Sequence, residues 1–140
     1  MDYKRIMGLD IGDVRIGVAL SDLLLITAQG RETYTRCGDA GKDADYLIGI
    51  AKSNNVSKIV CGLPKNMNGS IGEQAEKTQA FVDLMKSRTD IEIIFVDERL
   101  TTASATRVLL EADVSREKRK KVVDKIAATY ILQTYLDSHR

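Results

Sequence analysis

Short apolar runs separated by glycine-bounded turns open the chain, a pattern typical of β-strands. Residues 6–20 hold two such runs around one turn and predict a β-hairpin. Residues two apart on a strand share a face, so Asp10 should point the same way as Ile6 and Gly8. Residues 27–35 alternate loosely between polar and apolar positions. They predict a third strand, and the three strands together form a meander.

Helical periodicity alternates with continuous apolar runs through the rest of the chain, which predicts helices between strands that are covered on both faces. The pattern first predicts a helix over residues 39–53 and a strand over 57–63. It then predicts a helix that starts with a capping box at Ser70 and Glu73 and has Ile71 on its apolar stripe, followed by a strand over 91–96. A helix capped by Thr101 or Thr102 comes next, and a last helix follows the basic segment 116–121 and ends near Leu136. This order predicts a single α/β domain over residues 1–140, with a mixed sheet and helices on both faces.

Composition places the chain among globular proteins, because 44% of its 140 residues are hydrophobic and 29% are charged. No apolar run approaches the ~20 residues of a membrane helix, and no signal peptide is present, so we expect a cytoplasmic protein without a membrane partner. Cys37 and Cys61 do not form a CxxC motif, and Cys61 lies in an apolar run as a core residue would. The net charge of +1 argues against a general polyanion binder.

Two carboxylates stand at the ends of predicted strands, where burial is costly unless a metal ion or a hydrogen-bond donor compensates it. Asp10 ends the first apolar run, and Glu98 follows the strand over residues 91–96. Ligands of parallel α/β sheets gather at this end of the strands. Asp97 should point to the opposite face and is the weaker candidate. For Asp10, a simple turn-forming role remains the alternative.

A third carboxylate, Asp124, begins an apolar stripe on the last predicted helix. Asp124, Ala128, Ile131 and Tyr135 follow one another at i, i+4, i+7 and i+11, on the face expected to pack against the sheet. Asp124 is therefore either a first-turn acid that favours the helix dipole or part of a site.

Asp10, Glu98 and Asp124 could converge at one edge of the sheet. Carboxylate oxygens suit Mg²⁺ or Mn²⁺, and the single His139 near the C-terminus makes a zinc site a poor fit. Two such ions ~4 Å apart can activate a water and stabilise a leaving oxygen in phosphodiester hydrolysis. The spacing thus predicts a candidate two-metal site.

Several motifs, taken in order, resemble the YqgF/RuvX family nearly from end to end. They are Gly8-Leu9-Asp10-x-Gly12-x-x-Arg15-Ile16-Gly17-Val18-Ala19, Gly62-Leu63-Pro64, Asn68-Gly69-Ser70, Asp97-Glu98-Arg99-Leu100-Thr101-Thr102 and Asp124-x-x-Ala127-Ala128. The resemblance implies an RNase H-like fold with a five-stranded mixed sheet. It also implies that Asp10, Glu98 and Asp124 are metal-binding catalytic acids. The activity it implies is a nuclease, which either matures the 5′ end of pre-16S rRNA or resolves Holliday junctions.

A basic segment precedes Asp124 and is a candidate for binding phosphates. Its cations are Arg116, Lys118, Arg119, Lys120 and Lys121. Arg15 and Arg99 lie near Asp10 and Glu98 in sequence, and each could bind phosphate or pair with a carboxylate. Stacking aromatics are scarce, with two Phe, five Tyr and no Trp, which favours structured RNA such as pre-rRNA, or branched DNA, recognised by shape.

Two other classes of function remain as alternatives. An ATPase of the actin and sugar-kinase type opens with a similar Asp-x-Gly hairpin but generally needs a second domain. A nucleic-acid-binding module without catalysis would have no use for clustered acids facing phosphates. The sequence leaves open whether the protein is a monomer or a homodimer.

Overall fold

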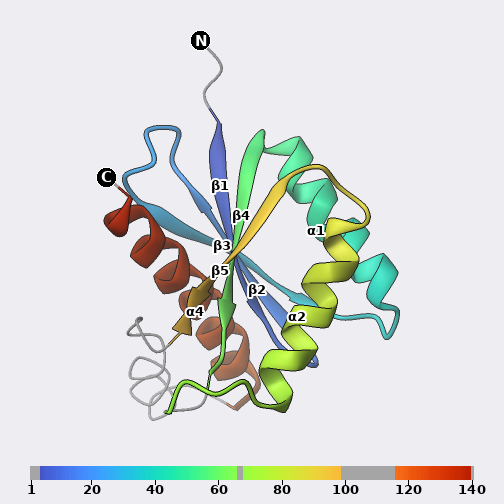
Figure 1. The fold of residues 1–140 in the computed structure, drawn as a ribbon. Helices are drawn as coiled ribbons and strands as arrows, with labels where there is room; N and C mark the ends of the chain where they lie inside the picture. The colour runs from blue at the N-terminus through green and yellow to red at the C-terminus, as the bar shows by residue number, and fades with distance from the viewer. Residues whose placement is uncertain (1–3, 66–67, 99–115, 140) are drawn as a thin grey trace.

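The computed structural model describes residues 4–65, 68–98 and 116–139, and for residues 116–123 it describes the backbone only. Five strands and three helices lie in these ranges. They are β1 (Arg5–Ile11), β2 (Arg15–Ser21), β3 (Ala28–Thr35), α1 (Ala40–Ser53), β4 (Val56–Leu63), α2 (Glu73–Lys86), β5 (Glu92–Asp97) and α4 (Arg116–Ser138) (Figure 1).

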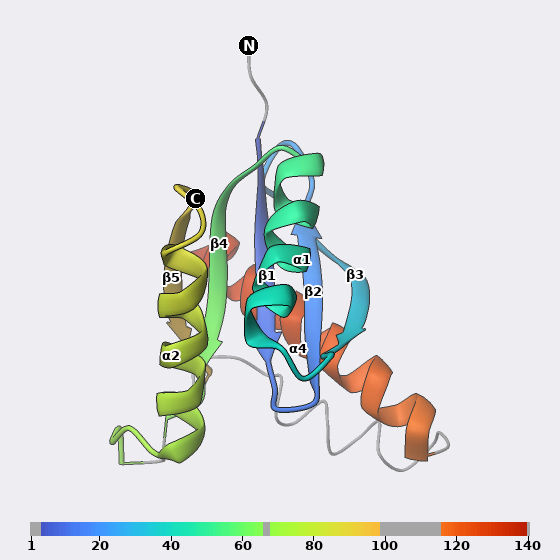
Figure 2. The same ribbon diagram turned by 90° about the vertical axis from the view of Figure 1, so that its right-hand side faces the viewer.

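The strands form one mixed sheet in the order β3-β2-β1-β4-β5, with β1 at its centre. β1 and β2 pair antiparallel as the predicted hairpin, and β3 continues the meander. β4 runs parallel to β1, and β5 runs parallel to β4. In Figure 2, α1 and α2 lie in front of the sheet and α4 lies behind it. The predicted mixed sheet with helices on both faces is confirmed.

Each face of the sheet has its own apolar core, as the alternation along β1 predicts. Met7 and Leu9 are fully buried in the cluster beneath α1 and α2. Ile6 belongs to the smaller cluster beneath α4, together with Ala128 and Ile131 of the predicted helix stripe. Cys61 is buried in the first cluster, and burial raises the pKa of its thiol to about 12, as expected of an unreactive core cysteine.

Glycines let α4 pack unusually close to the sheet backbone. A Cβ on Gly8 would lie 2.7 Å from the Cβ of Leu132, and one on Gly17 would overlap the backbone carbonyl of Asp124. At Gly17, the group that comes close to the sheet backbone is therefore a helix of the same chain. These contacts fix where Asp124 stands above the sheet.

The predicted capping box at the start of α2 is wrong. The backbone N–H and the hydroxyl of Ser70 donate to the Asn68 side chain at 3.0 and 2.7 Å, so this hydroxyl is engaged in a local turn. The helix begins instead at Glu73, with Gly72 as an N-cap that makes no side-chain hydrogen bond. Ile71 is 42% exposed and lies outside the buried stripe.

The last helix begins earlier than predicted, because α4 runs through the basic segment from Arg116. Lys, Arg and Glu are good helix formers, so the segment continues the helix instead of leading into it. The helix that Thr101 or Thr102 should cap lies outside the described residues. None of the helices in the described ranges is long and apolar enough to span a membrane.

Candidate active site

The carboxyl ends of the three parallel strands and the β1–β2 turn meet at one end of the sheet, at the bottom of Figure 2. The turn is closed by a hydrogen bond from the Gly12 N–H to the Arg15 carbonyl, at 2.9 Å. α4 crosses this end of the sheet at Gly17, because the Asp124 carbonyl stands above that glycine. Segments that are far apart in the sequence therefore converge here.

Asp10 stands between two glycines, and the other two predicted acids lie over them. Gly17 is the β2 partner of Asp10, and Asp124 packs its backbone on that glycine. Leu9 lies beside Cys61 in the parallel pairing, so the same register carried one residue further places Gly62 beside Asp10. A Cβ on Gly62 would lie 2.9 Å from Glu98 Cγ and 3.0 Å from its Oε1. The three carboxylates thus share one end and one face of the sheet.

Asp124 forms an ion pair with Arg15 across 109 residues of sequence. Arg15 Nε donates to Asp124 Oδ2 at 3.0 Å, and the two side chains are 24% and 21% exposed. Since α4 begins at Arg116, Asp124 lies about two turns inside the helix and is not a first-turn acid. Of the two roles left open for Arg15, the structure shows the pairing with a carboxylate.

The residue types of this site fit a divalent cation, because Asp10, Glu98 and Asp124 offer carboxylate oxygens. In this conformation, however, the described residues include no group of three or more His, Cys, Asp or Glu side chains placed to hold one metal ion. The Asp124 carboxylate faces a guanidinium instead.

A buried network that the sequence analysis missed anchors the β1–β2 turn from the other face of the sheet. Asp43 of α1 is 1% exposed and accepts hydrogen bonds from Tyr34 Oη (2.8 Å), Arg36 Nε (2.9 Å) and the Cys37 N–H (3.1 Å). Arg36 Nη1 also donates to the Gly12 carbonyl at 3.0 Å. The sequence offered one signal for this network, which is that Asp43 stands next to the apolar positions of the predicted helix. The network joins α1 to the turn that follows Asp10.

The charges of this network set the pKa values of its members. Burial alone raises the pKa of Asp43, but the hydrogen bonds from Arg36, Cys37 and Tyr34 outweigh it and hold the pKa below its ordinary 3.8. The hydrogen bond to ionised Asp43 in turn raises the pKa of Tyr34 well above 10.0. Both shifts favour an ionised Asp43 next to a neutral Tyr34 at neutral pH.

We expect Asp43→Asn to lower the free energy of unfolding by about 2 kcal/mol at pH 7, because it weakens hydrogen bonds to a charged, buried acceptor. The folded-state pKa lies below the unfolded one, so this contribution is complete above about pH 4 and is lost as the pH falls through the folded-state pKa. Urea unfolding of both proteins between pH 7 and pH 3 measures the difference. A difference that stays constant to pH 3 would contradict the assignment.

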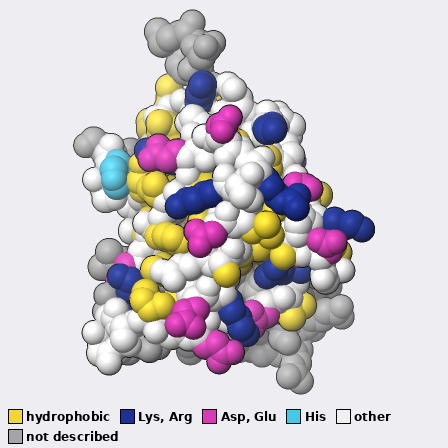
Figure 3. Space-filling view, turned by 45° about the vertical axis from the view of Figure 1, so that its right-hand side comes forward, with side chains coloured by type: hydrophobic (Ala, Val, Ile, Leu, Met, Phe, Trp, Pro, Cys, Tyr) yellow, Lys and Arg dark blue, Asp and Glu magenta, His cyan; other side chains and the backbone are white. Residues whose placement is uncertain are grey.

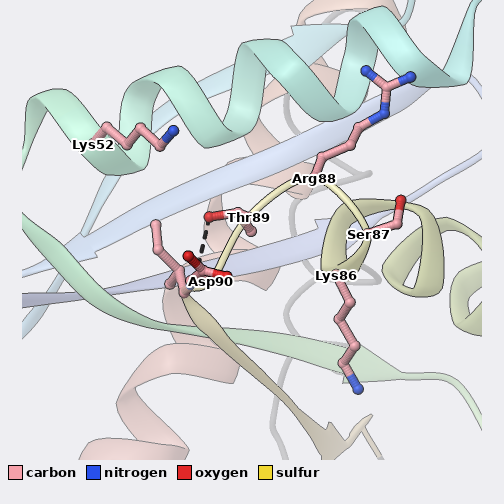
Figure 4. A pocket seen from close by; sticks show the side chains of 7 residues that line it. Lys52, Lys86, Ser87, Arg88, Thr89 and Asp90 are labelled. Carbon is pink, nitrogen blue, oxygen red and sulfur yellow. Dashed lines mark hydrogen bonds between the residues drawn. The ribbon is translucent and has the colours of Figure 1, made fainter.

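A hollow of about 410 Å³ lies at the opposite end of the sheet, before β5 begins. Its cationic lining residues are Lys52, Lys86 and Arg88. Figure 4 shows Lys86 pointing away from Lys52 and Arg88 reaching toward α1, where its Nη1 contacts both carboxylate oxygens of Asp45 at 2.9 and 2.8 Å. Because these cations do not converge, the hollow is not the candidate active site.

The other predicted phosphate-binding residues stay predictions. Arg99 lies outside the described residues, as do the side chains of Arg116, Lys118, Arg119, Lys120 and Lys121. The face drawn in Figure 3 carries basic and acidic side chains interspersed with one another. That face therefore does not offer the one-signed surface that non-specific phosphate binding favours.

Comparisons with known proteins agree with this fold. Residues 4–138 match the model of a family described as RuvX: Holliday junction resolvase. A Clostridioides difficile protein named "Putative pre-16S rRNA nuclease" is 59% identical over 133 residues, which are 95% of this chain and 94% of the relative. A Clostridium botulinum protein of the same name is 58% identical over 134 residues, covering 96% and 97%.

Among solved structures, the chain resembles "T. thermophilus RuvC in complex with Holliday junction substrate". The TM-score is 0.59 and the sequence identity 8%, with 97% of this chain and 96% of that chain covered. At this identity the likeness shows the fold alone, and it confirms the predicted RNase H-like architecture.

Proposed function

We propose, from the premise that the chain belongs to the RuvX family, that it is a nuclease that hydrolyses phosphodiester bonds in structured nucleic acid. The observation that carries the proposal is the placement of Asp10, Glu98 and Asp124 at one end and on one face of the sheet. Catalysis would depend on Mg²⁺ or Mn²⁺, held by these three carboxylates. We further propose that the protein acts in the cytoplasm.

The chemistry follows from what acidic side chains can do beside a phosphodiester. Carboxylates by themselves repel phosphate, so a binding protein would gain nothing from three of them in one place. When bound, divalent ions would activate the attacking water and stabilise the leaving oxygen. Asp10 stands between the other two acids and would be the shared anchor. The cations of residues 116–121 would contribute sequence-independent binding of the phosphate backbone.

Pre-16S rRNA is the first-choice substrate, because relatives at 58–59% identity over nearly their whole length carry that name. A four-way DNA junction is the second, since the family description names it. The scarcity of stacking aromatics fits both, because each is recognised by shape more than by base stacking.

The test offers the purified protein a pre-16S rRNA leader and a four-way DNA junction in parallel, at low salt, with Mg²⁺, with Mn²⁺ or with EDTA. We expect cleavage of the RNA at the 5′ end of the mature sequence, and none in EDTA. An RNA that begins at the mature 5′ end is the matched control and should stay intact. Symmetric nicking of the junction alone would favour the resolvase. Tight binding of either substrate without cleavage would leave the non-catalytic binding module as the better account.

A further inference from the structure

The contact between Arg15 and Asp124 places a cation on one of the three proposed metal ligands. It is a direct hydrogen bond of 3.0 Å between partly buried groups, and it is therefore stronger than an exposed ion pair. A carboxylate held in this way is less available to a metal ion. In the same conformation, no three ligands among the described residues are placed to hold one metal ion.

Arg15 and its neighbours fix Asp124 at two points. Arg15 and Gly17 share one face of β2, since they are two residues apart on a strand. The backbone of Asp124 packs on Gly17, and the carboxylate of Asp124 accepts a hydrogen bond from Arg15. Rotation of the Asp124 side chain, with the backbone unmoved on Gly17, would change the partner of the carboxylate without moving the helix.

The guanidinium can bind more than one anion. An arginine presents five N–H donors, and the contact with Asp124 uses Nε. Nη1 and Nη2 of Arg15 make no hydrogen bond to any residue within 4–65, 68–98 or 124–139. The side chain is 24% exposed, so solvent and phosphate reach it. Arginine matches the geometry of phosphate as well as that of carboxylate.

We propose that Arg15 is an exchangeable partner of Asp124: it holds the carboxylate in the resting protein and transfers to a substrate phosphate when Asp124 joins Asp10 and Glu98 in binding metal. The inference rests on the proposed nuclease function and assigns a positioning role to Arg15. The exchange couples the two binding events. Metal bound to Asp124 releases Arg15 for phosphate, and phosphate bound to Arg15 releases Asp124 for metal, so each ligand increases the affinity for the other. The resting protein would therefore hold metal weakly until a substrate arrives.

The test measures the affinity for Mn²⁺ alone, without nucleic acid, from the paramagnetic resonance signal of free Mn²⁺. Arg15→Gln removes the competitor of the metal, and we expect it to bind Mn²⁺ about tenfold more tightly than the unaltered protein. Lys77→Gln is the matched control, because it removes the same charge as Arg15→Gln at a nearby position. Lys77 pairs with Asp13 of the β1–β2 turn at 3.6 Å. It should change the affinity less than twofold. Arg15→Lys, which keeps the charge but not the Nε contact, should fall between the two.

A second readout separates exchange from a merely structural role. Arg15→Gln should cleave nucleic acid about tenfold more slowly at saturating Mn²⁺, although it binds the metal more tightly. Equal or weaker Mn²⁺ binding by Arg15→Gln, with normal urea unfolding, would overturn the inference and leave the nuclease proposal standing. An equal gain in Mn²⁺ affinity in Lys77→Gln would also overturn the inference, because the change in net charge alone would then explain the tighter binding. No Mn²⁺ binding by either the unaltered protein or Arg15→Gln would refute both the inference and the metal dependence of the proposed function.

Discussion

Asp10→Asn should lower the rate of phosphodiester cleavage by ~10³-fold or more at saturating Mg²⁺, because it removes the negative charge from the central one of three acids. The free energy of unfolding should change by less than about 1 kcal/mol. Asn has the shape of Asp, and the loss of a charge between Asp124 and Glu98 relieves repulsion. Single-turnover cleavage of the pre-16S leader and urea unfolding of the same preparation measure the two effects.

Asp13→Asn is the matched control for this experiment. Asp13 lies in the β1–β2 turn that follows Asp10, but it is exposed, and its carboxylate pairs with Lys77. We expect its cleavage rate to stay within twofold of the unaltered protein, since a surface ion pair contributes little. If both variants lost activity equally, the charge of the turn and not the Asp10 position would govern catalysis. If Asp10→Asn stayed active, the three-acid site would be refuted.

The strands and the faces of the sheet were predictable because they depend on local periodicity. The alternation in β1 placed Asp10 on the same face as Ile6 and Gly8, and the stripe on α4 placed Asp124 toward the sheet. The capping box failed for a local reason too. The sequence pattern at Ser70 suits a cap, but the helix begins at Glu73 with Gly72 at the N-cap position, and the Ser70 hydroxyl donates to Asn68 Oδ1 in the preceding turn.

The contacts between distant segments could not be predicted, because they depend on tertiary register. The pair of Arg15 and Asp124 exists only once α4 lies across β2, and the sequence left two roles open for the arginine. The buried Asp43 depends in the same way on how β3 brings Arg36 to α1. The charged contacts of the site thus depend on how α4 packs on the sheet, and that packing depends on the absence of a side chain at Gly17.

Gly17→Ala should therefore act on stability and on activity together. The new Cβ would meet the backbone carbonyl of Asp124, which cannot rotate away as a side chain could, so α4 must shift. We expect a loss of about 3 kcal/mol in the free energy of unfolding, from overpacking in a closely packed interface. Gly49→Ala is the matched control, because a Cβ on this exposed glycine of α1 would have no neighbour within 4 Å. That change should stabilise the protein by up to about 1 kcal/mol.

The cleavage rate distinguishes a displaced Asp124 from a protein that is only less stable. At a temperature where Gly17→Ala is fully folded by circular dichroism, cleavage should still fall by ~10²-fold, because a shift of about 1 Å in a catalytic group has that effect. A variant that loses stability but cleaves normally when folded would show that the position of Asp124 tolerates movement of α4. A variant with unchanged stability would show that α4 does not rest on Gly17. The fold would then not depend on this glycine, and the cleavage rate alone would report on the site.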